Sequence, residues 1–550
     1  MVVRSDGAGE RFNRFATQAL KARGFTLATA SLSDADANAG AEREWWDDDI
    51  YTPLHADKSQ IALDLTAVIA KALSDSHQIK SFGLLPAIRE TAVREAEGRF
   101  TPEAFGEAQI RRINDPATSP ALTAGEDRLL TTDRTLEVGV RSRIRTGAEV
   151  TLAQRFSTID TNQTDFIPGQ QASSRTTLTV IQPLLRGSGL DYNNAPTRIA
   201  ELDTKIAQFE LVRQVENHLL EVERAYWNLY NTRANLFLSR HLARHGRTLA
   251  NQAVAREDFD GDPTLVIRAT AAWRKWEADT VRAEAAVKNA QFRLAALTDA
   301  PELKLTDAEF ITMTPPLAVS PKVTKQQILD EVVERRPELQ QAFLQYEAAT
   351  LREGVAANES LPELDLIAEG VYSGNDVDQR LGGAVRDSEL GGLVGLRFSV
   401  PLGYDEREAR HERRKLETVQ QRHQTRAALS SVLLEVEVSA SELAVAIQDL
   451  QQQRRARLAA QRELQALRVQ WEEGAGFDTM AAILTELIGA HERAMLQEAS
   501  VAQARATIAV AAANFSRSRG VLLDRWDAQI SPTTGVRDNR IYRLNALLSE

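Results

Sequence analysis

The chain contains a run of sequence that is too long and too uninterrupted for a helix of an ordinary globular protein. From Asp405 to Glu473 there is neither glycine nor proline, the two residues that most often interrupt a helix. A second run, from Pro196 to about Arg256, contains Gly246 as its only glycine and no further proline. A helix of ~60 residues is about 90 Å long, which is wider than a single globular core. Helices of this length need partners along their length, as in a coiled coil.

The expected partners follow in the sequence. After a short break, each long run is succeeded by an alanine-rich helical pattern, at 264–297 and at 477–522. Alanine on the contact face lets two helices approach closely, so each long helix is predicted to fold back on its successor. The sequence therefore predicts two antiparallel helical hairpins, over residues 191–298 and 405–522.

The chain also repeats itself. Residues 66–102 line up without a gap on residues 326–362, and the Pro-Leu pair at 183 lines up on the pair at 401. Each copy has the pattern helical segment, strand pair, helical hairpin, which predicts a duplicated unit that closes around a pseudo-symmetric axis. The strand block has 81 residues in the first copy and 39 in the second, a 42-residue excess.

Composition excludes several classes of protein. With 43% hydrophobic and 26% charged residues, the 550-residue chain is expected to fold, and its net charge of −11 gives no reason to expect nucleic acid as a partner. It contains no cysteine, so it has neither a disulfide framework nor a thiolate metal site. No stretch approaches ~20 consecutive apolar residues, so no transmembrane helix is predicted. No catalytic constellation stands out, and we expect neither an enzyme nor a cofactor.

The strand blocks alternate with period 2. From Leu136 to Phe156 the large apolar residues fall on even positions and the charged residues on odd positions, with a return strand at 174–185, which predicts a β-hairpin over 135–185. A second hairpin is predicted over 363–402, with Leu396 and Phe398 alternating with Arg397. Charged residues on the odd positions of both blocks are candidates for one shared surface: Glu137, Arg141, Arg143, Arg145, Arg155 and Arg397.

Such strands suit a wall between lipid and water. Strands in lipid must close into a barrel, because lipid cannot satisfy backbone hydrogen bonds. Four strands per chain cannot close a barrel alone, so several chains would share one. The charged positions would then line a water-filled lumen and set its ion preference. The alternative is that they form the outer face of a soluble sheet.

Short motifs add a resemblance to a known family. The chain resembles the TolC-like outer membrane efflux proteins over most of its length, from about residue 62 to 525. The motifs that carry the resemblance are Arg-Pro-Glu-Leu at 336–339, Leu-Pro-Glu-Leu at 361–364, Gln-Pro-Leu-Leu-Arg-Gly at 182–187, Ala-Tyr-Trp at 225–227, and Gly261. Each motif is weak alone, and their order along the double repeat makes the match specific.

The resemblance implies a mostly α fold with a small membrane β part. Three chains would share a 12-stranded barrel in the outer membrane and form a coiled-coil tunnel in the periplasm. The homotrimer would serve as the passive exit duct of a tripartite efflux or type I secretion system, docked through a periplasmic adaptor (membrane fusion) protein to an inner-membrane transporter. The resemblance also implies an adaptor-docking tip at Arg256, Gly261, Gly474 and Gly476, and an aperture near Asp478 and Glu486.

This reading divides the chain into five parts. They are an N-terminal extension or linker (1–60), a first repeat (61–300), a linker (301–324), a second repeat (325–525) and a C-terminal tail (526–550). Within the extension, residues 12–30 are basic and mildly apolar, and polar residues interrupt any signal-like core. A degenerate secretion signal is one interpretation of this segment.

Two other interpretations stay open at this point. His241 and His245 lie four apart on one predicted helix, a spacing able to bind a metal, although no third ligand is evident. The plainer interpretation makes both histidines solvated helix positions. For the whole chain, the alternative to a channel is a periplasmic coiled-coil adaptor or scaffold without a pore.

Overall fold

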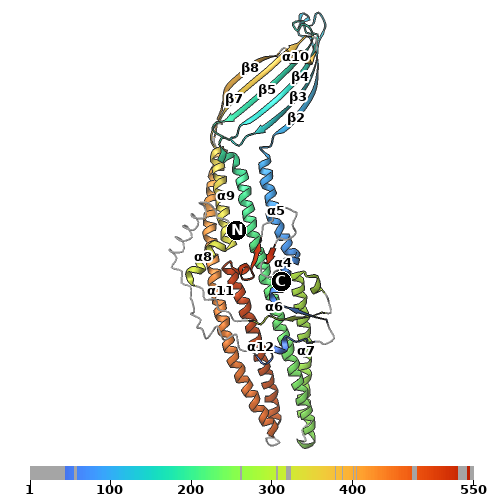
Figure 1. Cartoon of the computed structure of the whole chain (residues 1–550), viewed down its shortest axis with the longest axis vertical. Helices are drawn as coiled ribbons and strands as arrows, with labels where there is room; N and C mark the ends of the chain where they lie inside the picture. The colour runs from blue at the N-terminus through green and yellow to red at the C-terminus, as the bar shows by residue number, and fades with distance from the viewer. Residues whose placement is uncertain are drawn as a thin grey trace. The chain divides into compact units, whose positions relative to one another are not determined.

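The structure, a computed structural model, falls into two units that are described separately. It describes residues 44–54, 59–260, 263–304, 308–316, 324–377, 380–386, 388–400, 402–403, 405–473, 480–530 and 542–544. The core unit comprises segments 1–87, 206–343 and 425–550, and the sheet unit comprises segments 88–205 and 344–424. Figure 1 shows the elements of both units.

Helices make up most of the described chain. The longest are α6 (Leu190–Asp260, 71 residues) and α11 (Asp405–Glu473, 69 residues), and α11 fills the run that lacks glycine and proline. They are followed by α7 (Pro263–Thr298) and α12 (Met480–Ser518). None of the helices in the described segments is both long enough and apolar enough to span a membrane.

Shorter helices precede each set of strands. In chain order they are α4 (Leu65–Asp75), α5 (His77–Gly98), α8 (Lys325–Arg335) and α9 (Pro337–Glu359). The helix α8 begins with a capping box, in which Thr324 and Gln327 satisfy each other's backbone amides.

The first helical segment is interrupted at an unexpected position. Gly83 and Pro86 are of the residue types that most often interrupt a helix, but α5 runs through both residues. The chain turns instead at Ser76, whose hydroxyl is buried and lies 3.3 Å from His218 Nε2. A tertiary contact therefore sets the break, and the local breakers do not.

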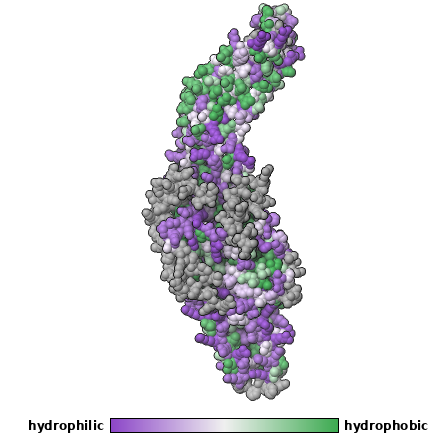
Figure 2. Space-filling model, viewed as in Figure 1, coloured by the Kyte–Doolittle hydropathy of each residue, from purple (hydrophilic) through white to green (hydrophobic). Residues whose placement is uncertain are grey.

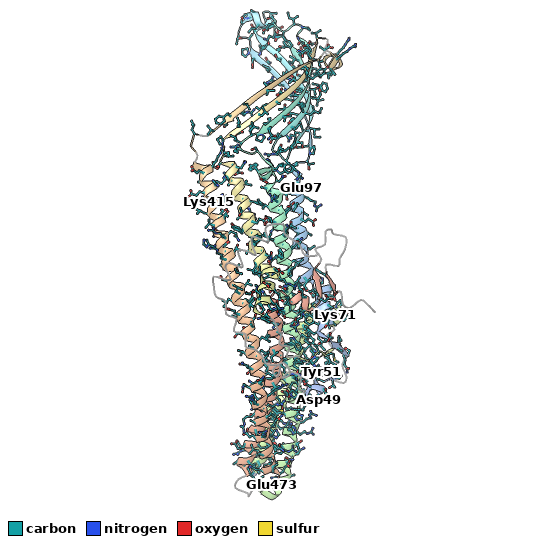
Figure 3. The ribbon with its side chains drawn as sticks, turned by 60° about the vertical axis from the view of Figure 1, so that its left-hand side comes forward. Asp49, Tyr51, Lys71, Glu97, Lys415 and Glu473 are labelled. Carbon is teal, nitrogen blue, oxygen red and sulfur yellow. The ribbon has the colours of Figure 1, made fainter. Side chains whose placement is uncertain are left out.

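Residues 44–54 are part of the core unit, which corrects the expectation of a linker reaching to residue 60. The short helix α3 (Asp47–Ile50) is held against α12, where Arg505 Nη1 lies 2.6 Å from Asp47. The buried Trp46 indole donates a hydrogen bond to Glu498 at 2.9 Å. Asp49 and Tyr51 are labelled in Figure 3, beside the helices of this unit.

A second segment expected as a linker is also built into the core unit. Within 301–324, residues Pro301–Lys304 form a 3₁₀ turn and Glu309–Thr312 form β6, whose residues are all buried. The strand β6 pairs in parallel with β1 (Gln60–Leu63). Near the C-terminus, α13 (Leu522–Arg525) is followed by β9 (Ala528–Ile530), which pairs antiparallel with β10 (Tyr542–Leu544).

The sheet unit contains one six-stranded sheet with the order β2-β3-β4-β5-β7-β8, and every neighbouring pair is antiparallel. A short helix, α10 (Leu381–Arg386), lies between the last two strands in the sequence. The strands are β2 (Glu103–Pro116), β3 (Arg128–Arg143), β4 (Glu149–Thr161), β5 (Gln170–Pro183), β7 (Glu363–Asp376) and β8 (Glu389–Ser399).

Six strands correct the sequence-based count of four. The run from Leu136 to Phe156 was expected to be one strand, but it turns back at 144–148, where Gly147 has φ +98°. Arg143 of β3 lies opposite Glu149 of β4 in the strand register. Odd-numbered residues of β3 therefore lie opposite odd-numbered residues of β4, and the sequence alternation continues through the turn. The second additional strand is β2, which lies where a loop was expected.

Candidate functional site

The sheet has two chemically distinct faces. The register places residues of equal parity opposite each other in every strand pair, as in the row Val140, Leu152, Leu178, Gly370, Gly392. Side chains alternate between the two faces of a strand. All even-numbered strand residues therefore share one face, here called the apolar face, and all odd-numbered residues share the other, the charged face.

Large hydrophobic side chains lie exposed on the apolar face. Apart from Leu393, every exposed large hydrophobic residue of the six strands has an even number. Figure 2 shows hydrophobic residues gathered over the strands. The charged residues with even numbers all lie toward the end of the strands remote from the α5–β2 connection: Arg112, Arg128, Arg134, Asp160 and Asp376.

Five of the six candidate residues of the strands share the charged face. Glu137, Arg141 and Arg143 lie on β3, Arg155 on β4 and Arg397 on β8. Arg155 lies directly opposite Glu137 and donates to it through Nε at 2.8 Å. Cross-strand pairs of opposite charge stabilise a sheet by a few tenths of a kcal/mol each, up to about 1 kcal/mol.

The sixth candidate, Arg145, lies in the turn after β3 and outside the strands. Its guanidinium lies 5.6 Å from the centre of the Phe100 ring, close to the start of β2. Its odd number places it with the others in the sequence, because the alternation continues through the turn.

Other residues of the charged face were not predicted from the sequence. Glu103 accepts a hydrogen bond from Arg141 Nε at 2.9 Å, and Arg111 lies 3.6 Å from Asp133, each across the β2–β3 pair. Arg175 of β5 is also on this face. At 103–109, Ala and Gly at even positions alternate with Glu, Phe, Glu and Gln, a weak signal because small residues have little strand preference.

A cavity of about 680 Å³ lies among the helices of the sheet unit. It is lined by α5, α6, α9 and α11, and these helices contribute both apolar and arginine side chains. Figure 3 labels Glu97 of α5 and Lys415 of α11, which belong to this part of the chain. Its lining includes Ala92, Ile199, Val355, Arg352 and Arg410.

The predicted tip is described in part. Gly261, Gly474, Gly476 and Asp478 lie outside the described residues. Arg256, near the end of α6, donates through Nη2 to the carbonyl of Trp471 of α11 at 2.7 Å, and its guanidinium lies 4.5 Å from that indole ring.

The second predicted aperture residue lies on the surface of α12. Glu486 is exposed and lies 3.9 Å from Arg493 of the same helix. The preceding residue, Thr485, accepts a hydrogen bond from Arg268 Nη1 of α7 at 3.1 Å. The start of α12 is therefore tied to α7 through Thr485.

The two histidines of α6 belong to a half-buried cluster and are not simply solvated. The Nε2 atoms of His241 and His245 lie 2.8 Å apart, and the ring of His491 of α12 stacks on His245 at 5.5 Å. Burial and neighbouring charge lower the pKa of His241 and of His491 to about 4. Among the residues that the structure describes, no group of three or more His, Asp or Glu side chains is arranged to hold a metal ion.

Comparison with known proteins identifies the fold. No family model matches the chain, and no curated protein sequence matches it. The CmeC outer membrane channel of Campylobacter jejuni is 11% identical and superposes with a TM-score of 0.61 over 88% of this chain and 93% of that chain. The outer membrane protein VceC of Vibrio cholerae is 14% identical (TM-score 0.60, 83% and 96%), and the MtrE outer membrane channel of Neisseria gonorrhoeae is 15% identical (TM-score 0.57, 83% and 89%). The chain therefore has the fold of these outer-membrane channels.

Proposed function

We propose that this chain is one subunit of a trimeric outer-membrane channel with a large periplasmic part. It would be the passive exit duct of a tripartite efflux or type I secretion system that carries small molecules or proteins out of the periplasm. The observation that carries the proposal is the sheet with one apolar and one charged face. Barrels in the outer membrane have this division between a lipid-facing outside and a polar lumen.

The charged face is proposed to line the lumen. Glu137, Arg141, Arg143, Arg155 and Arg397 would then contact the water in the pore, and Arg145 would lie at its periplasmic rim. The cross-strand ion pairs support this assignment, because paired charges belong in water and are costly against lipid.

The long helical hairpins are proposed to stack as a tunnel, with their ends as the docking site for a periplasmic adaptor. The ends include Arg256, Gly261, Gly474 and Gly476, and the aperture would lie near Asp478 and Glu486. An inner-membrane transporter would supply the energy, and this chain would have neither enzymatic activity nor a cofactor.

The internal repeat is proposed to reflect a duplication. The helices α4 and α5 begin at residues 65 and 77, and α8 and α9 begin at residues 325 and 337. The strands β2 and β7 begin at 103 and 363, the same offset of 260. Equal spacing of three consecutive elements supports a common origin of the two copies.

The proposal is tested by expressing the chain with its native upstream gene region and fractionating the cells. Protein extracted from the outer membrane would be sized in detergent and then added to planar bilayers. We expect a trimer that resists dissociation in SDS until it is heated, and discrete conductance steps.

A soluble monomer or dimer without conductance would overturn the proposal and favour a coiled-coil scaffold. To control for conductance by contaminants, the same preparation is made from cells whose gene for this chain carries a stop codon in the region that encodes β3. Steps that persist in that preparation do not come from this chain.

A further inference from the structure

The sheet ends in two long strands that each have a neighbour on one side only. Among the described strands, β2 pairs only with β3, and β8 pairs only with β7. These edges are 14 and 11 residues long. A long exposed edge offers a row of unpaired N–H and C=O groups to another strand, and in lipid such groups must be paired.

The directions of the two edges fit each other. Every neighbouring pair in the six-stranded order is antiparallel, so β2 and β8 run in opposite directions. If β2 of one chain is placed beside β8 of a second copy in a ring, the new pair is antiparallel as well. The up-and-down alternation then continues across the seam, as a head-to-tail ring requires.

The two faces restrict the register of this seam. A slip of one residue would place the apolar residues of one copy beside the charged residues of the next, so partners must have equal parity. One such register sets Ala104 opposite Leu396 and Gly106 opposite Val394. The smallest side chains of β2 then lie beside large residues of β8 that are 70% and 79% exposed in the single chain.

Charge selects the same register. With Ala104 opposite Leu396, Glu103 faces Arg397, and Arg111 faces Glu389. A shift of two residues in one direction loses both pairs and sets Arg112 beside Leu390. A shift of four in that direction keeps one favourable pair, Glu107 with Arg397, but sets Asp115 beside Glu389, which repel each other. Opposite charges directly across a strand pair are favourable, and like charges are not.

From these observations we infer that β2 of one chain pairs with β8 of a second copy, and that each chain contributes six strands to the shared barrel. The inference rests on the proposed trimeric channel. Three copies of the six-stranded sheet give 18 strands, in place of the 12 that the resemblance implied. Barrel diameter grows roughly linearly with strand number, so this barrel would be about half as wide again.

The extra strands are integral to the wall. In the repeat alignment β2 corresponds to β7, so the 42-residue excess of the first block falls on the region of β3 and β4. These strands lie inside the sheet order, between β2 and β5. They also carry much of the apolar face, including Leu136, Val138 and Leu152. They cannot leave the wall without breaking the strand ladder.

The test uses a chain that contains no cysteine of its own. The double variant Ala104→Cys, Leu396→Cys is oxidised in outer membranes and analysed on non-reducing gels. Within one chain the two positions are five strand spacings apart, about 24 Å, so a disulfide between them must join two copies. We expect covalent dimers and trimers that reducing agent converts to monomers.

The matched control is Ala104→Cys, Gly392→Cys. Gly392 is on the same face of β8 but about 13 Å further along the strand, which is too far for a disulfide. We expect no covalent dimers or trimers from this variant. Equal cross-linking of both variants would overturn the register.

A second measurement does not depend on the variants. Electron cryomicroscopy of the unmodified protein counts the strands in the barrel. A trimer with 18 strands supports the inference, and a trimer with 12 strands overturns it while leaving the proposed channel intact. Absence of any trimer would instead contradict the proposed function on which the inference rests.

Discussion

At the scale of single residues, Arg233 connects three parts of the core unit. It is completely buried on α6 and pairs with Glu309 of β6 at 2.6 Å. It also donates through Nη2 to the carbonyls of Ile50 and Thr52, at 3.0 and 2.9 Å. One guanidinium therefore satisfies a buried carboxylate and the backbone of the N-terminal segment.

We expect Arg233→Ala to lower the free energy of unfolding by about 3–5 kcal/mol, because it removes the buried arginine that pairs with the buried Glu309 carboxylate. Thermal or urea unfolding in detergent measures the change. The control on the same helix is Arg224→Ala, which removes a surface ion pair with Glu221 and should cost less than about 1 kcal/mol. Equal losses in the two variants would contradict this role of Arg233.

Glu216 makes the stability of the core unit depend on pH. Burial raises the pKa of its carboxyl to about 8, against the pull of Arg336 and Arg517. The folded state thus keeps a proton that the unfolded chain releases near pH 4.5, and this residue's contribution to stability is lost as the pH rises from about 4.5 to 8. We expect Glu216→Gln, which mimics the neutral carboxyl, to raise the melting temperature, and to raise it more at pH 8 than at pH 5.

Glu210 lies six residues earlier on α6, and its replacement by glutamine should change the melting temperature in the opposite direction. Burial alone would raise its pKa, but hydrogen bonds from Arg213, Gln214 and Gln341 outweigh burial and lower the pKa to about 2. Glu210→Gln should therefore lower the melting temperature at neutral pH. If both glutamine variants shift it in the same direction, the two pKa assignments are wrong.

The histidine cluster should lower the stability of the protein at acidic pH. Burial lowers the pKa of His491 to about 4, with further lowering by His245, Arg468 and His241. The unfolded histidine takes up a proton near pH 6.5, so stability is full above that pH and falls as the pH drops toward 4. We expect the melting temperature of the His491→Gln variant to fall less between pH 6.5 and pH 4 than that of the unmodified protein. An unchanged slope would contradict the burial of a neutral ring.

At the scale of elements, adjacent positions of β5 separate the two faces. Leu178 lies on the apolar face and Thr179 on the charged face, opposite Glu369 of β7. An arginine on a lipid-facing strand costs about 2–4 kcal/mol near the middle of the membrane. We expect Leu178→Arg to reduce trimer assembly in the outer membrane and Thr179→Arg to assemble normally, measured as heat-modifiable trimer on gels. The reverse result would assign the faces the other way round.

The sequence predicts some elements well and others poorly. The α11 helix is predictable because nothing in 405–473 interrupts helical periodicity. The charged face is predictable on β3 and β4, where arginines alternate with large apolar residues. The β2 strand is not, because Ala104, Gly106 and Ala108 carry little strand signal, and the turn at Gly147 is hidden because pairing across it preserves parity.

Other elements depend on contacts that no local pattern contains. Ser76 ends α4 through a buried contact with His218, while Pro86 is tolerated inside α5. Trp46 packs in the core and donates to the distant Glu498, whereas the residues next to it in the sequence are mainly charged. Long-range partners of this kind decide where the core unit begins.

At the scale of the whole molecule, the N-terminal segment makes contacts that can form only late in synthesis. Trp46 bonds to Glu498, 452 positions later, and Asp47 bonds to Arg505, 458 positions later. Such contacts close very long loops and form late in folding. During synthesis, residues 44–54 must wait until most of the chain has been made before their partners on α12 exist.

A chain that stops after α11 should therefore lack the contacts that hold Trp46 and Asp47, and its segment 44–54 should be less protected. We expect a variant truncated after Glu473 to be cleaved by protease near residues 44–54, while the full chain is protected there, as mass spectrometry of the fragments would show. Protection of the truncated chain would mean that α12 does not hold the segment. The contacts of Trp46 and Asp47 with α12 thus form only after most of the chain has been made, and a factor that keeps the newly made chain unfolded would shield these two residues until then.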